Sequence, residues 1–384
     1  MKGVKRQLAR LLSGRHGALW VSVLSVLMTL LTAGLMLLIM GKNPLTAFYS
    51  FLQGCGFAPK GKYGGGSGML TDLSDFLNYL TPMLLASLAF IVAFKAGLFN
   101  IGIAGQMLLS GFLATVLVAY NKQLPSLVSR PLILAVGIVA GGLLGALIGF
   151  LKYRFNIHEV VSTIMINYII SYATGFFINN SYVDMMTRTS RACPAGARLT
   201  LTKVQIGGVN CMVPLGLIVA ALAVAAVWFV FSRTTFGFEL RAVGLNARCA
   251  RYSGVNVGRR VVAAMALSGV LAGLAGVTYY LGYTNTIIPK TLAGMGYDSI
   301  SVALLGNASP IGAVFAAIIV SLFQQGSNYM SSTVGVSREI ASLITGILLL
   351  YASCGTYIRM ISDRFLQRND HGDTANDNEE VKAL

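Results

Sequence analysis

Long apolar runs, almost free of charged residues, follow one another along most of this chain. About 20 mainly apolar residues suffice for a helix to cross the hydrocarbon core of a bilayer. Such runs lie at 18–40, 76–94, 101–120, 131–151, 160–179, 212–231 and 261–281, and shorter ones lie at 297–305, 311–325 and 340–354. The pattern predicts an all-α, polytopic membrane protein with about ten transmembrane segments, some of them short or broken.

The composition argues against a soluble protein. Hydrophobic residues make up 55% of the chain and charged residues 11%, whereas soluble domains carry roughly 25% charged residues. The net charge of +16 would also fit a nucleic-acid binder, but such a binder presents one contiguous cationic face. Here the cations fall in the gaps between apolar runs, as expected when Lys and Arg collect on the cytoplasmic side of a membrane.

The same charges predict the orientation in a plasma or inner membrane. We expect a basic cytoplasmic amino terminus at 1–17, a transmembrane domain at 18–358, and a cytoplasmic, acidic and disordered tail at 359–384. In this orientation 18 of the 29 Lys and Arg residues face the cytoplasm and 11 face outside. The inverse orientation would reverse that split, so both termini are predicted to lie inside the cell.

One basic segment, 233–260, separates two of the apolar runs. It contains a single acid, Glu239, and six arginines: Arg233, Arg241, Arg248, Arg251, Arg259 and Arg260. Each Arg at the centre of a membrane helix would cost about 2.5–3.5 kcal/mol on insertion scales, so the segment lies in water. We expect the dipeptide Phe236-Gly237 to end the preceding span and a short amphipathic helix to follow over 239–246. A solvated loop that only fixes the orientation is the alternative.

A glycine repeat marks one tightly packed helix. Bare backbone recurs every fourth residue along the run 131–151, at Gly137, Gly141, Gly145 and Gly149. Small residues at this spacing form one stripe, which lets a neighbouring membrane helix approach closely. Gly269 and Gly273 repeat the pattern more weakly. We predict a helix-packing role rather than a ligand role for this stripe.

Polar residues interrupt some apolar runs. Asn100 and Gln106 flank a glycine-rich stretch, and Asn167 and Tyr168 lie within another run. Polar groups at membrane depth either line a cavity or bond to one another between helices, and the sequence leaves both alternatives open. Asp298 begins a run too short to span, so it is either a functional acid or a helix cap.

Four motifs together resemble the membrane permeases of bacterial ABC importers. They are FKAGLFNIGIAGQ (94–106), NIHEVVSTIMINYI (156–169), FGFELRAVGLNARCARYSGV (236–255) with LSGVLAGLAGV (267–277), and GMGYDSISVALLGNASPIG (294–312). The resemblance is to the nucleoside and simple-sugar branch of the branched-chain amino acid and ribose permease superfamily. It implies the fold of a type II ABC importer permease. One departure is Ala104, where relatives usually carry Glu.

The resemblance also implies roles for particular residues. In the segment 233–260 it implies contact with an ATPase, carried by Glu239, Leu240, Arg241, Gly244 and Asn246. For the substrate path of such a permease, we expect the residues Phe99, Asn100, Gln106, Asn167, Tyr168, Asp298 and Ser301.

Partners follow from the same resemblance. Two ABC ATPase subunits would bind ATP and Mg²⁺, so this chain would hold no cofactor and would not be an enzyme itself. A second permease, homologous or identical, and an extracytoplasmic substrate-binding lipoprotein would complete the importer. The expected cargo is a nucleoside, with simple sugars as the alternative and no nucleic acid as a partner.

Other functional classes find little support in the residues. The stretch GFAPKGK at 56–62 is one residue short of a phosphate-binding loop and is followed by Tyr63 rather than Ser or Thr. His16, His158 and His371 are scattered, and no catalytic pair or metal-ligand spacing is present. An ion-coupled secondary transporter would need more ionisable residues at membrane depth. Of the five cysteines, three fall in expected external loops, which leaves one disulfide as an alternative to idle thiols.

Overall fold

The computed structural model describes residues 17–60, 68–121, 124–206 and 209–335, together with isolated positions up to 360. It divides into two compact units, Met1–Ala47 with Arg338–Leu384, and Phe48–Ser337. The first unit contains α2 (Gly17–Ile39), whose Ser25 hydroxyl donates a hydrogen bond to the Tyr351 carbonyl at 3.2 Å. Most of the predicted run 340–354 lies outside the described residues.

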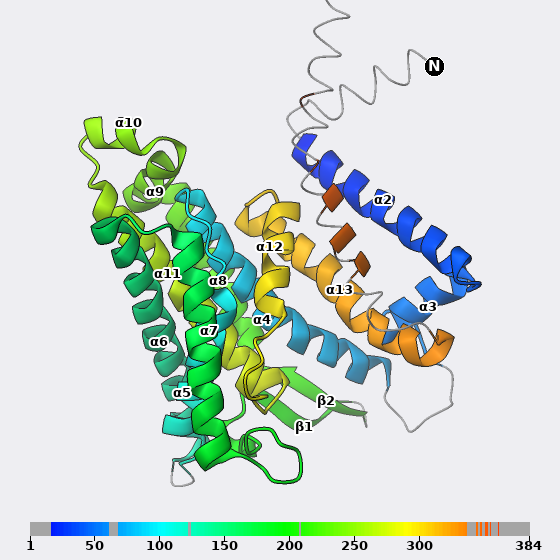
Figure 1. Ribbon diagram of the computed structural model, residues 1–384. Helices are drawn as coiled ribbons and strands as arrows, with labels where there is room; N and C mark the ends of the chain where they lie inside the picture. Colours follow the sequence, from blue (N-terminus) through cyan, green and yellow to red (C-terminus); the bar gives the residue numbers. More distant parts are fainter. Residues whose placement is uncertain are drawn as a thin grey trace, which may run out of the picture. The chain divides into compact units, whose positions relative to one another are not determined.

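The second unit is a bundle of apolar helices, and Figure 1 shows its elements. α3 (Pro44–Gly54) leads into it from the first unit. The long helices are α4 (Met69–Lys95), α6 (Ser126–Phe155), α7 (Glu159–Phe177), α8 (Gly216–Arg233), α11 (Val257–Thr278) and α13 (Pro310–Val334). The shorter helices are α5 (Ile103–Ala114), α9 (Thr235–Leu245), α10 (Ala247–Tyr252) and α12 (Met295–Leu305). Three helices of the bundle continue as a turn of π-helix. η1 (Thr115–Ala119) follows α5, η2 (Ile178–Tyr182) follows α7 and η4 (Tyr279–Tyr283) follows α11.

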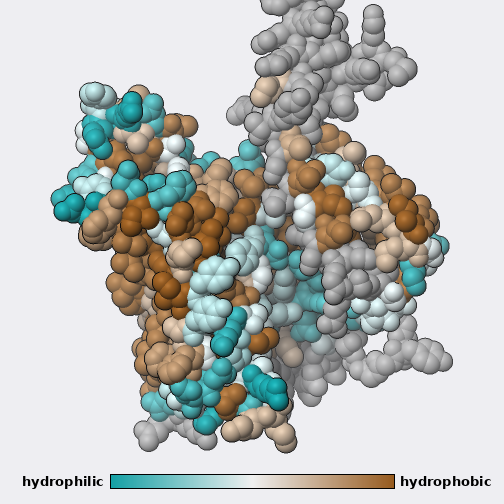
Figure 2. All heavy atoms as spheres, viewed as in Figure 1, coloured by the Kyte–Doolittle hydropathy of each residue, from teal (hydrophilic) through white to brown (hydrophobic). Residues whose placement is uncertain are grey.

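The helix content confirms the predicted all-α, polytopic membrane architecture. Within the described residues, seven helices are long and apolar enough to cross a membrane. Of the runs expected to be short, 297–305 is confirmed as the short helix 295–305, whereas 311–325 belongs to the long helix α13. The run 101–120, expected to be long, forms the shorter apolar helix 103–119. In the space-filling view, apolar side chains form a band over α5, α6 and α7, with polar side chains at both ends (Figure 2). Such a band is the surface that hydrocarbon covers.

α4 lies at the centre of the second unit. It is apolar around most of its circumference, and all of its residues from Leu80 to Ala93 are buried. A helix that is apolar all round is stable only when other helices surround it. The helices α11, α12, α13 and α8 all pack against α4. α4 therefore connects most of the long helices of this unit.

The glycine stripe of α6 lies against α11, its most extensive packing partner. A Cβ atom at Gly141 would overlap the Gly269 carbonyl oxygen, and one at Gly273 would overlap the Gly137 carbonyl oxygen. At Gly145 the added Cβ would overlap the Met265 carbonyl oxygen. Each helix therefore offers bare backbone where the other approaches, so the two backbones meet with no side chain between them.

A β-hairpin is the main element that the sequence did not predict. β1 (Thr200–Ile206) pairs antiparallel with β2 (Val209–Pro214), with Thr200 opposite Pro214 and an irregularity between Leu201 and Val204. The predicted span 212–231 was therefore wrong at its start: its first residues belong to β2, and α8 begins only after Pro214. An isolated apolar strand next to a helix is hard to separate from that helix by hydropathy alone.

The hairpin is fastened to the end of the bundle opposite α9 and α10 (Figure 1). The Thr200 hydroxyl lies 3.0 Å from the Asn78 side-chain oxygen of α4 and donates to the Gly282 carbonyl of η4 at 2.9 Å.

Two of the cysteines expected outside the cell, Cys193 and Cys55, are buried and free. Neither forms the external disulfide that the sequence left open, and the side chain of Cys211 is outside the described part.

Candidate coupling and transport sites

Thr234 makes the corner between the apolar helix α8 and the polar segment that follows it. Its hydroxyl donates to the Val230 carbonyl at 2.6 Å and accepts from the Gly237 amide at 3.1 Å. This N-cap ends α8 at Arg233 and starts α9 at once. The prediction that Phe236-Gly237 ends the span was therefore wrong, because both residues lie in the first turns of α9.

Glu239 fastens α9 to α11. Its carboxylate pairs with the guanidinium of Arg260 near the start of α11. The same guanidinium lies over the Phe236 ring, 5.1 Å from its centroid. On the inner face of α9, Leu240 is fully buried. Two of the residues expected to meet an ATPase, Glu239 and Leu240, thus make contacts within this chain.

Gly244 brings α9 against the end of α4. A Cβ at Gly244 would overlap the Lys95 carbonyl oxygen, and one at Gly97 would lie 3.1 Å from the Gly244 Cα. Gly97 has a φ of +74°, a left-handed conformation that suits glycine and ends α4 sharply. Because backbone meets backbone here, α9 cannot shift far without moving α4.

The outward face of α9 and α10 combines apolar and cationic side chains. Phe238 is 63% exposed, Leu245 is 88% exposed and Tyr252 is 94% exposed. Arg241, Arg248 and Arg251 are also exposed on these two helices. Large apolar residues are rarely left in water at the tip of a polar segment, so their presence favours a protein partner. We call these six residues the elbow surface.

Asn246 separates the two helices of the elbow. Its side-chain oxygen accepts from the amides of Arg248 and Cys249, at 3.0 and 3.2 Å, and so caps α10. Among the coupling residues predicted from the sequence, Arg241 is thus the one whose side chain belongs to the elbow surface, while Asn246 and Gly244 shape the backbone beneath it.

Asn100 and Gln106 lie in a fully buried polar network. The Asn100 amide donates to the Gln106 side-chain oxygen at 3.2 Å and to the Ser268 hydroxyl at 2.9 Å. Ser268 in turn donates to the Ala89 carbonyl of α4 at 2.6 Å. The network joins α4, α5 and α11, and only Gln106 Nε2 lacks a partner among the described residues. Of the two alternatives left open by the sequence, this geometry is that of bonding between helices.

Asn167 joins a second set of elements. Its side-chain oxygen accepts from the Gly105 amide at 2.9 Å, and its amide donates to the Ile101 carbonyl at 3.0 Å. The same amide lies 3.4 Å from the Tyr297 hydroxyl. Its neighbour Tyr168 points the other way, and 58% of it is exposed on the outer face of α7. The structure therefore does not bring Asn167 and Tyr168 to one surface.

Three further positions named from the sequence are packed into the bundle. Ala104 is fully buried, and a Cβ at Gly296 would lie 2.7 Å from it. Phe99 makes an edge-to-face contact with Phe90, with ring centroids 5.1 Å apart. Ser301 on α12 is buried. A Glu side chain in place of Ala104 would need room that the close approach of α12 does not leave.

Asp298 belongs to a half-buried cluster that the sequence did not reveal as a whole. Its carboxylate accepts from the Gln324 amide of α13 at 3.2 Å, and it interacts electrostatically with Tyr79 and Tyr279. The Tyr283 ring lies 5.2 Å from that of Tyr79 and 5.9 Å from that of Tyr279, between ring centroids. The Tyr283 hydroxyl accepts from Gln325 at 3.0 Å. We call Tyr79, Tyr279, Tyr283, Asp298, Gln324 and Gln325 the tyrosine–aspartate cluster.

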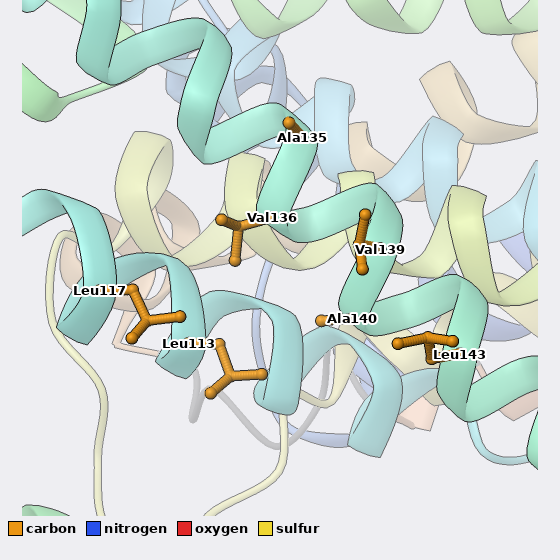
Figure 3. Close-up of a pocket in the computed structure, with 7 residues that line it drawn as sticks. All are labelled: Leu113, Leu117, Ala135, Val136, Val139, Ala140 and Leu143. Carbon is orange, nitrogen blue, oxygen red and sulfur yellow. The ribbon is translucent and has the colours of Figure 1, made fainter.

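A separate apolar groove lies on the surface of α5, η1 and α6 (Figure 3). Its volume is about 330 Å³, and Leu113, Leu117 and five apolar side chains of α6 line it. Leu117 is 61% exposed and Leu143 is 66% exposed. A ligand site for a polar solute needs a few directed hydrogen-bonding groups, and this lining has none. The groove is part of the apolar band that faces lipid.

Comparisons with known proteins converge on one kind of protein. A family model for the permease component of branched-chain amino acid transport systems matches residues 73–353. The guanosine ABC transporter permease protein NupP of Bacillus subtilis is 33% identical over 92% of this chain and 98% of its own length. The nucleoside ABC transporter permease protein NupB of Lactococcus lactis is 31% identical, with 86% and 89% covered. The glucose ABC transporter permease protein TsgB13 of Haloferax volcanii is 27% identical, with 86% and 85% covered.

Proposed function

This chain belongs to the family of permease components of branched-chain amino acid transport systems, and from its relatives within that family we propose that it imports nucleosides. A multi-pass permease of an ABC transporter works with ATPase and substrate-binding partners. We infer that a second permease, homologous or identical, forms the passage with this chain. The substrate-binding partner would be an external lipoprotein, and ATP and Mg²⁺ would be bound by the ATPase subunits.

The cargo is proposed from relatives. Those named for guanosine and for nucleosides are 33% and 31% identical to this chain over most of its length. The relative named for glucose is 27% identical, and it favours simple sugars as the second candidate. Uptake driven by an ion gradient alone is the third candidate, which the family membership disfavours.

We propose that the ATPase binds the elbow surface and moves it, and the way α9 is attached to its neighbouring helices supports this proposal. α9 is tied to α11 through Glu239 and Arg260, and to the end of α4 through Gly244. Tyr79 of the tyrosine–aspartate cluster lies on α4, and Tyr279 lies on η4, the π-helical turn that continues α11. A push on α9 by a closing ATPase would therefore reach the cluster along two rigid helices.

The orientation follows from the same surface. Six arginines lie between the end of α8 and the start of α11, at 233–260, and such a cationic segment belongs on the cytoplasmic side. We infer that α9 and α10 face the cytoplasm and that the hairpin β1–β2 faces outside. From the excess of Lys and Arg in the expected cytoplasmic segments, we also propose that the two termini are cytoplasmic.

Uptake into proteoliposomes tests the cargo and the energy source together. The complete transporter is reconstituted with its binding protein outside, and radiolabelled guanosine, adenosine, cytidine, ribose and glucose are supplied in turn. We expect nucleoside accumulation only with ATP in the ATPase compartment, and no accumulation with an ion gradient alone. Sugar uptake without nucleoside uptake would support the second candidate, and gradient-driven uptake would overturn the ABC reading.

A further inference from the structure

The tyrosine–aspartate cluster combines two kinds of group that bind a flat, polar ring. Its tyrosines come from α4 and η4, and its acid and amides come from α12 and α13. All six side chains are half-buried, so each is supported by the bundle yet still reaches a surface. The four elements are separated by up to about 250 residues in the sequence but pack around α4.

The aromatic part of the cluster consists of three tyrosine rings in contact. Tyr283 meets Tyr79 edge-to-face and is tilted against Tyr279, so none of these pairs is stacked face to face. η4, which presents two of these tyrosines, is a turn of π-helix, a form that occurs often at functional sites. Every nucleobase has a flat π-face that stacks on aromatic side chains.

The polar part of the cluster accepts and donates hydrogen bonds beside these rings. One oxygen of Asp298 accepts from Gln324, and the other, Oδ1, has no hydrogen-bond partner within the described part of the chain. No ion pair to Asp298 occurs among the described residues either. A carboxylate with a vacant acceptor position fits a ligand that presents N–H donors.

We infer that the tyrosine–aspartate cluster is a base-recognition subsite of the transport path, and that it prefers bases with adjacent N–H donors. The inference rests on the proposed nucleoside import. Guanine presents N1–H and the exocyclic N2 amine on one edge, which a carboxylate can accept together. Adenine presents an acceptor, N1, beside its N6 amine, so it meets the same carboxylate with one donor and one repulsive contact.

Two classes of variant separate the polar and aromatic roles. Asp298→Asn keeps the shape of the side chain but replaces one acceptor oxygen by an NH2 donor. The Asn side chain can then donate to N1 and accept from N6 of adenine, whereas it can no longer accept from both donors of guanine. Tyr79→Leu removes a stacking face without touching the acid. Their matched controls are Asp184→Asn, at a turn away from the cluster, and Tyr49→Leu, at an exposed position on α3.

The rate of ATP-driven uptake into proteoliposomes is measured with guanosine and with adenosine, at saturating loaded binding protein. Saturation removes capture by the binding protein from the comparison. We expect Asp298→Asn to lower the guanosine rate on the order of tenfold and to change the adenosine rate less than about twofold. Tyr79→Leu should lower both rates by about tenfold, and the two controls should match the wild type.

The outcomes distinguish this inference from the proposed function. If the wild-type transporter imports no nucleoside, the proposed function fails and the inference fails with it. If the wild type imports guanosine and Asp298→Asn leaves the ratio of guanosine to adenosine rates unchanged, the inference alone is overturned. The amount of Asp298→Asn that purifies with the ATPase subunits, compared with the wild type, checks that this variant folds and assembles.

Discussion

Single glycines decide how closely two helices of this permease approach. The fourfold spacing from Gly137 to Gly149 predicted one bare stripe, and the structure lays that stripe on Gly269 and Gly273 of α11. Gly142 adjoins the stripe, and an added Cβ there would lie 3.0 Å from the tip of the Val270 side chain and 3.9 Å from the Ala266 carbonyl oxygen. The fourfold spacing of these glycines, rather than the number of glycines in α6, therefore predicted where α6 and α11 are in contact.

This difference predicts the effect of one added methyl group. Gly141→Ala should destabilise the protein by about 1–3 kcal/mol, because its Cβ would overlap the Gly269 carbonyl oxygen, which belongs to a rigid backbone. Gly142→Ala should cost much less, since a side-chain tip can move aside. Thermal unfolding of the two variants in the same detergent measures the contrast. Equal stability of Gly141→Ala and the wild type would show that the helices do not meet here.

The contacts of several other residues could not be predicted from the sequence, because these contacts depend on how distant segments pack together. The polar character of Asn100 and Gln106 was evident, but whether they line a path or bond to each other depends on where Ser268 lies. Asp298 was a candidate because it begins a run too short to span, but Tyr79 and Tyr283 look ordinary in their own segments. Their relation becomes visible only when α4, η4 and α12 are packed together, because no local pattern links positions so far apart in the chain.

At the scale of elements, caps and hydropathy determined most of the boundaries. Apolar runs predicted the spans well, and the sharp transition from α8 to α9 depends on one hydroxyl, that of Thr234. The hairpin β1–β2 was missed, since Val209–Pro214 is apolar and directly precedes α8. The basic segment predicted one short helix, whereas Asn246 divides it into α9 and α10.

The orientation of α10 can be tested with a native cysteine. Cys249 is exposed on α10, whereas Cys55 and Cys193 are buried, and burial raises their pKa to about 12 and about 11. Maleimides react with the thiolate, so these two cysteines should react little at neutral pH. In a Cys211→Ser, Cys354→Ser background, an impermeant maleimide should label the protein only after the cells are permeabilised.

The control for this labelling is the same background with Cys249→Ser, which reports any reaction at the buried cysteines. Labelling of Cys249 in intact cells, above that control, would mean that the elbow faces the exterior. The proposed direction of coupling would then be wrong, although the membership in the permease family would stand.

At the scale of the whole molecule, the proposed site of energy input and the proposed subsite for cargo lie on different elements. The elbow surface lies at one end of the bundle, the hairpin lies at the other (Figure 1), and α4 and α11 run between them. α9 holds both helices at the elbow end, by an ion pair at Arg260 and by backbone contact beyond Lys95. Rigid helices transmit a displacement over this length because packed interiors deform little.

The central claim is that this chain receives mechanical work from a separate ATPase through the elbow surface, and Arg241→Glu tests it most directly. ATP-driven uptake and co-purification of the ATPase are measured for Arg241→Glu and for Arg154→Glu, an exposed arginine at the end of α6 that is not part of the elbow. We expect Arg241→Glu to lose uptake on the order of tenfold or more while its level in the membrane is unchanged, and Arg154→Glu to behave as the wild type. Normal ATPase binding and normal uptake by Arg241→Glu would contradict the account.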